Sequence, residues 1–165
     1  KMSSGSEPHS QKKIEGLRCF GGAAVPAQLR GDLAPLSAFA PADVDSLATL
    51  VLTHLRLLDA QGLVAAVAAF AKARDLNKSA MAGLEGAVRG LVALLQAAAR
   101  HDAAPRDVSD DAKRLGLKAE AADAVESAWV AFAAKARDGA DDGAAAGLLP
   151  AAVDAETLRR LVDLE

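Results

Sequence analysis

Apolar residues recur every three or four positions along most of the chain, which is the spacing of one face of an α-helix. Residues 41–58 form one such stretch, and Pro41 and Asp43 suit its first turn. Its apolar stripe consists of Val44, Leu47, Val51, Leu55 and Leu58. Residues 60–74 form the next stretch, capped by Asp59. Its stripe consists of Leu63, Val64, Val67, Phe70 and Ala71. The pattern therefore predicts two consecutive helices.

The longest stretch, residues 78–100, predicts a helix in the middle of a bundle. Asn77 or Ser79 begins it. Its stripe is broad and consists of Met81, Leu84, Val88, Leu91, Val92, Leu94, Leu95 and Ala98. A stripe this wide favours contact with several neighbours. The helix is also interrupted by three glycines, namely Gly83, Gly86 and Gly90. Glycine lowers helix propensity, so we expect these residues to permit close approach of a neighbouring backbone.

Shorter helices are predicted over 25–34, 105–115 and 119–137, with a final segment at 155–163. The run from Leu115 through Gly116 to Leu117 is typical of a helix that ends in a Schellman motif. Strand-like alternation does not occur before the last few residues. The predicted fold class is therefore all-α, a compact bundle of six or more short helices.

The chain ends differ in character from this helical part. Residues 1–16 are polar and rich in serine, and we expect a disordered leader, either native or added for expression. Residues 17–153 are expected to form one helical domain. Residues 138–147, rich in glycine, alanine and aspartate, predict a loop within it.

Composition narrows the function classes. The chain has 165 residues, a net charge of −3 and one cysteine, Cys19. Basic residues are scattered among acids, which argues against nucleic-acid binding. A lone cysteine excludes an intrachain disulfide, and a small buried apolar residue is the favoured interpretation of Cys19. Residues 84–99 come closest to a membrane span, but Glu85 and Arg89 interrupt them, so membrane insertion is not expected.

Candidate chemistry is sparse. The acidic pairs Asp110-Asp111 and Asp141-Asp142 lie in polar surroundings and are expected to be solvated. His9 lies in the leader, His54 borders an apolar stripe, and His101 ends the long helix. None has a cysteine or histidine partner at metal-ligand spacing. Nucleotide-binding and nucleophile motifs are also missing from the sequence. The sequence thus predicts no catalytic residues, no cofactor, no metal and no enzyme activity.

Two regions resemble a known family. The first runs from Leu91 to His101, continues through Ala112–Lys118 with its Leu-Gly-Leu stop, and ends with the helix 121–129 that carries a tryptophan. This order of helices resembles the N-terminal helical domain of the COMM-domain-containing proteins. The second region, Leu158–Glu165, is similar to the short segment that leads into the C-terminal COMM domain in that family.

The resemblance implies a scaffold role. Members pair through their COMM domains and assemble with coiled-coil subunits into the Commander complex, which recycles membrane cargo from endosomes; members are also linked to NF-κB regulation. It further implies that residues 154–165 are a linker toward a COMM domain absent from this sequence. By the same resemblance, four residues are expected to form the hinge into that domain, namely Leu161, Val162, Asp163 and Leu164. The expected partners are other family members and the coiled-coil subunits, contacted mainly through the COMM domain. A cytoplasmic, endosome-associated location and a monomeric state for this part of the protein are also implied.

Two other interpretations of the residues stay open. A generic helical adaptor could bind a partner helix in an apolar groove. A helical bundle rich in alanine and glycine could also enclose an apolar ligand in a cavity between its helices.

Overall fold

The computed structural model describes residues 14, 16–25, 27–57 and 60–138. These residues form six α-helices and two 3₁₀ turns, which confirms the all-α prediction. In chain order the elements are η1 (Arg18–Phe20), α1 (Gln28–Leu33), η2 (Ala34–Ala38), α2 (Pro41–Arg56), α3 (Ala60–Ala73), α4 (Lys78–Arg100), α5 (Pro105–Arg114) and α6 (Ala119–Asp138).

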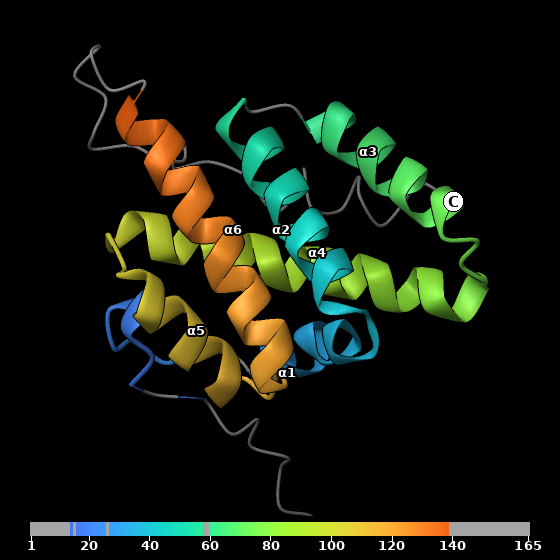
Figure 1. Ribbon diagram of the computed structural model, residues 1–165. Coiled ribbons are helices and arrows are strands. Elements are labelled where there is room, and N and C mark those ends of the chain that lie inside the picture. Colours follow the sequence, from blue (N-terminus) through green and yellow to red (C-terminus); the bar gives the residue numbers. More distant parts are fainter. Residues whose placement is uncertain (1–13, 15, 26, 58–59, 139–165) are drawn as a thin grey trace, which may run out of the picture.

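Helix α4 lies at the centre of the bundle, as its broad stripe predicts. It crosses behind α2 and α6 and contacts α1, α2, α5 and both 3₁₀ turns (Figure 1). Helices α2 and α6 pack against each other, and α5 packs against α6. Helix α3 lies along α2 at the edge of the bundle (Figure 1). The core therefore forms where α4 and α6 pack against α2 and where α1 packs against α4.

The residues that begin the helices are largely those expected. The Asn77 side chain accepts a hydrogen bond from the Ala80 N–H at 2.8 Å, so Asn77 is the cap of α4. Pro41 and Pro105 occupy first turns, where a missing N–H has no consequence. The expected cap Asp59 and the stripe residue Leu58 lie outside the described residues.

The first predicted helix needs a correction. Residues 25–34 were expected to form one helix, whereas α1 is only six residues long and passes directly into η2. The change lies mainly at the start of the helix, because Val25 exchanges two backbone hydrogen bonds with Ile14 and so stands outside α1.

Glycine brings α4 close to α1, as predicted. A Cβ atom at Gly90 would lie 2.7 Å from Leu33 Cδ2 and 2.8 Å from its Cγ. At Gly83 the nearest atom is Pro35 Cβ, at 3.3 Å. Gly86 is also buried, but a Cβ there would meet its neighbours at ordinary contact distance, 3.7 Å. The packing thus requires a glycine at Gly90. A Cβ atom would fit tightly at Gly83 and with ordinary contacts at Gly86.

Three helices end in the same hydrogen-bond pattern. At the end of α5 the Leu117 N–H bonds to Ala112 O and the Gly116 N–H to Lys113 O, which confirms the predicted Schellman motif. Helices α3 and α4 end in the same way, but an aspartate stands at the left-handed position. These aspartates are Asp75, with a φ of 52°, and Asp102, with a φ of 48°.

Helix α4 is long and apolar enough to cross a membrane, by length and composition alone, and it is the one such helix among the described residues. However, 56% of its most apolar window is buried inside the bundle. Arg89, which interrupts this window, pairs with Asp32 of α1 at 3.5 Å. A helix that is apolar over most of its surface is expected at the core of a bundle, so the packing accounts for its composition.

Candidate functional site

The four residues predicted as a hinge, Leu161, Val162, Asp163 and Leu164, lie outside the described residues, so their role stays a prediction. A candidate contact surface is found instead on α6. Its outward face carries a shallow, open hollow. The hollow is lined by Asp123, Glu126, Ser127, Val130 and Ala131.

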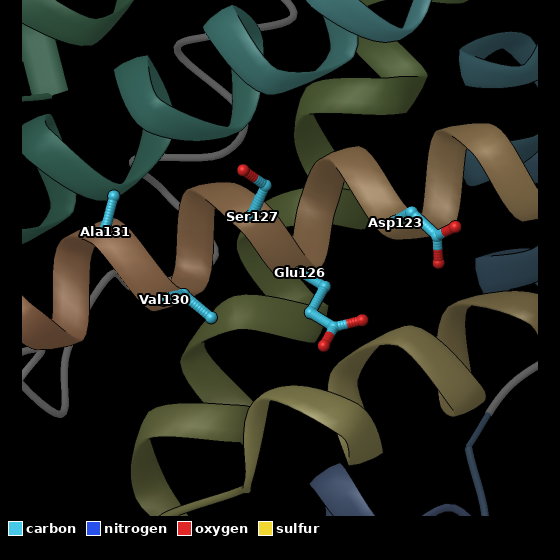
Figure 2. Close-up of a pocket in the computed structure, with 5 residues that line it drawn as sticks. All are labelled: Asp123, Glu126, Ser127, Val130 and Ala131. Atoms are coloured by element: carbon cyan, nitrogen blue, oxygen red, sulfur yellow. The ribbon is translucent and has the colours of Figure 1, made fainter.

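The hollow runs between two rows of side chains (Figure 2). Ser127 and Ala131 point to one side of the helix, and Glu126 and Val130 point to the other. Each row joins residues four positions apart, and such rows are the ridges between which a second helix packs. Val130 is 46% exposed, which is unusual for a large apolar residue of this domain. The hollow is therefore an exposed, largely polar strip of α6 that contains one large apolar side chain.

The acidic end of the hollow is only partly neutralised. Asp123 lies 3.5 Å from Lys113 Nζ and accepts a hydrogen bond from the Ser109 hydroxyl at 3.2 Å. Glu126, one turn further, is half-buried. A partner helix that presents an aliphatic side chain to Val130 and a cation to Glu126 would match this surface.

Asp111 corrects one prediction. The Asp110-Asp111 pair was expected to be solvated; Asp110 is exposed, but Asp111 is 2% exposed. Its carboxylate accepts a hydrogen bond from the Cys19 N–H at 2.7 Å. The burial of Asp111 could have been predicted from the spacing of apolar residues in α5, because Asp111 lies on the same helix face as the buried residues Val108, Ala112 and Leu115.

Asp111 belongs to a set of polar contacts that hold the segment before α1. Arg18 pairs with Asp107 at 2.9 Å, and Arg114 donates to Gly16 O at 2.7 Å. Ile14 and Val25 exchange two backbone hydrogen bonds of 3.0 Å. These contacts fix residues 14 and 16 within the folded domain. They connect the segment to α5 and are structural in character.

Cys19 lies in a setting that suppresses thiol reactivity. Its side chain is fully buried and unpaired. Burial raises the pKa of the Cys19 thiol, and its hydrogen bond to Asp111 raises the pKa further. The thiolate is the reactive form of cysteine, so this structure confirms the interpretation of Cys19 as a buried apolar residue.

The described histidines have structural positions. His54 Nδ1 lies 2.8 Å from Leu50 O, so its half-buried ring is satisfied within α2, as expected. His101 is the residue that ends α4, and its ring covers Gly21. Across the described parts of the chain, no three histidine, cysteine or acidic side chains gather in a way that could hold a metal ion.

The structure is that of a helical domain with one exposed candidate contact surface on α6. The comparison with protein families then identifies it: the chain belongs to the COMM-domain-containing family, because residues 23–129 match the family model described as COMMD2-7/10, HN domain. The match spans helices α1 to α5 and reaches Trp129 in α6. Domains of this family are not known as enzymes. Neither a curated protein nor a solved structure matches the chain.

Proposed function

We propose that this chain is the helical interaction module of a Commander-complex subunit and that it supports the recycling of membrane cargo from endosomes. Its partners are other COMM-domain-containing proteins and the coiled-coil subunits of the complex. It works in the cytoplasm, at the endosomal surface, without catalysis. We propose the fourth human member as a counterpart, on the likeness of the segment Leu17–Phe20, the helix over 44–58 and the long central helix.

The observation that carries this proposal is the family match over residues 23–129. The geometry is compatible with a role that needs no catalysis. Polar groups in the described core, such as Asp111 and Trp129, are used for internal hydrogen bonds, as in Trp129 Nε1–H to Ala103 O at 3.2 Å.

Affinity purification of the full-length natural protein that contains this chain tests the proposal. We expect COMM-domain-containing proteins and coiled-coil Commander subunits to co-purify, and a fluorescent fusion to collect on endosomes. Recovery of neither group of proteins, together with a diffuse or nuclear signal, would contradict the proposal.

A generic helical adaptor is the second candidate function. The observation that favours it is the same hollow on α6, which offers an apolar side chain and a carboxylate to any helix of matching pattern. A wild-type chain that binds unrelated basic amphipathic helices as tightly as it binds Commander subunits would favour this function. The apolar-ligand carrier gains no support at Gly90, where the small residue brings helices into contact instead of leaving space.

A further inference from the structure

Helix α3 is attached to the rest of the domain along one side only. Among the described elements, α2 is the one against which it packs extensively (Figure 1). Its inner stripe is buried and consists of Leu63, Val67, Phe70 and Ala71. Its outer face is exposed and consists of Gln61, Ala65, Ala68, Ala69 and Lys72. The helix thus forms a single outer layer over α2.

A cluster of four side chains holds the C-terminal end of this layer. Arg74 donates to Asp43 Oδ1 at 2.6 Å, which connects the end of α3 to the first turn of α2. The Arg74 guanidinium also lies 3.7 Å above the centre of the Phe70 ring. Phe70 in turn packs against Phe39, with ring centres 6.3 Å apart. We call Arg74, Asp43, Phe70 and Phe39 the α3 latch.

The interactions that make up the α3 latch are weak enough to break without unfolding the rest of the domain. Its ion pair is about one third exposed on both sides, so water competes for both groups. The Arg74 Nε atom is buried without a hydrogen-bond partner in the described structure, so the closed position leaves one donor unsatisfied. The closed position of α3 therefore carries a local cost at the Arg74 side chain.

We infer that α3 opens from α2 as one unit while α4 and the helices around it stay folded, and that the latch sets how often this happens. Elements with few buried contacts and half-exposed fastenings are those that open below the free energy of global unfolding. Opening would expose the inner stripe of α3 and the apolar face of α2 beneath it. The inference rests on the contacts of α3 and does not depend on the proposed function.

Hydrogen–deuterium exchange of the 165-residue chain, followed by mass spectrometry, tests this directly. We expect the amides of α3 to exchange faster than those of α4 in the wild type. Arg74→Ala should raise exchange in α3 by about 5- to 30-fold and leave α4 unchanged. Asp43→Asn should act in the same direction but less strongly, because it leaves the contact between Arg74 and the Phe70 ring in place. The double variant should add little to Arg74→Ala, which already removes the ion pair. Lys72→Ala is the matched control, since it removes an exposed cation from the same turn, and it should leave the exchange pattern as in the wild type.

Two results would overturn the inference. One is exchange of α3 at the same rate as the slowest amides of α4, which would mean that α3 opens only when the whole domain unfolds. The other is a uniform rise in all helices in Arg74→Ala, which would make the latch a global stabiliser. Circular dichroism of each variant, recorded first, establishes that the helical content is retained.

Discussion

Helices α3 and α4 are built from similar residues but occupy opposite positions in the domain. Both are rich in alanine and carry leucine and valine at three- and four-residue spacing. Yet α4 is buried around much of its circumference, whereas α3 buries one stripe and exposes alanines on the other side. The breadth of the stripe, together with glycines that admit a neighbour, separates the two. Apolar composition alone does not decide which helix becomes the core.

The largest difference should appear when one leucine is removed from each helix. Leu91→Ala in α4 should destabilise the domain by about 2–5 kcal/mol, because a fully buried cavity cannot close. Leu63→Ala in α3 should cost less, about 1.5–3 kcal/mol. The side chain is also buried, but α2 is the one described helix packed extensively against α3, so the site can close over the missing atoms. Urea denaturation followed by circular dichroism measures both. If both variants lose the same stability, α3 contributes to the core as much as α4 does, and the contrast between the two helices is wrong.

The glycines give the next test of the same contrast. Gly90→Ala should destabilise by about 1–3 kcal/mol despite the gain in helix propensity, because the new methyl group overlaps Leu33. Gly31→Ala is the control: it lies in α1 with no atom within 4 Å of its Cβ position, and it should stabilise by about 0.5–1 kcal/mol. If Gly90→Ala proves neutral, the α1–α4 contact is looser than its geometry indicates.

Alkaline titration probes the burial around η1, which packs against α4. The folded state holds the Cys19 thiol with a raised pKa, so the unfolded chain releases its proton first. Stability is therefore retained below a pH of about 8.5 and falls above it, by about 1.4 kcal/mol per pH unit from this group. The Cys19→Ala variant, compared at each pH, should lose this part of the slope. An unchanged slope would mean that the thiol ionises in the folded domain.

The smallest effects are expected at the helix ends. Asp75→Gly at the end of α3 and Asp102→Gly at the end of α4 should each stabilise by about 0.5–1 kcal/mol. Glycine relieves the left-handed conformation, and the change removes an acid from the negative end of a helix. Gly116→Asp, at the equivalent position of α5, should reverse the sign. Thermal unfolding followed by circular dichroism resolves these differences. If Asp102→Gly raises the stability of the domain and Asp75→Gly does not, the end of α4 matters more for global stability than the end of α3.

The sequence predicts most of this fold because its local signals agree with one another. Asn77, Pro41, Pro105 and Gly116 mark helix ends by their own backbone or hydrogen-bonding preferences, so the ends fall within a residue or two of expectation. The helix expected over 25–34 is present but begins later, at Gln28, because Val25 pairs with Ile14 through a contact that the local pattern does not record.

The polar contacts were harder to predict, because they join residues far apart in the chain. Asp111 bonds to Cys19, and Arg74 reaches Asp43, across separations that no local pattern records. The hollow on α6 depends on which face of that helix remains uncovered, and the apolar spacing around Val125 and Trp129 shows only which face is buried. Surface function is therefore less visible in the sequence than the core.

Direct binding to purified Commander components is the measurement that tests the central claim of a protein-interaction domain. The 165-residue chain would be titrated into an assembly of COMM-domain-containing proteins and coiled-coil subunits, so that the contact made by the helical domain is measured apart from contacts of the COMM domain. Binding would be followed by sedimentation velocity. We predict that the wild type binds, that Val130→Asp weakens binding at least about ten-fold by placing a charge in the hollow, and that Leu57→Asp, at another exposed apolar residue, leaves binding intact. No binding by the wild type, or an unchanged affinity in Val130→Asp, would contradict the account.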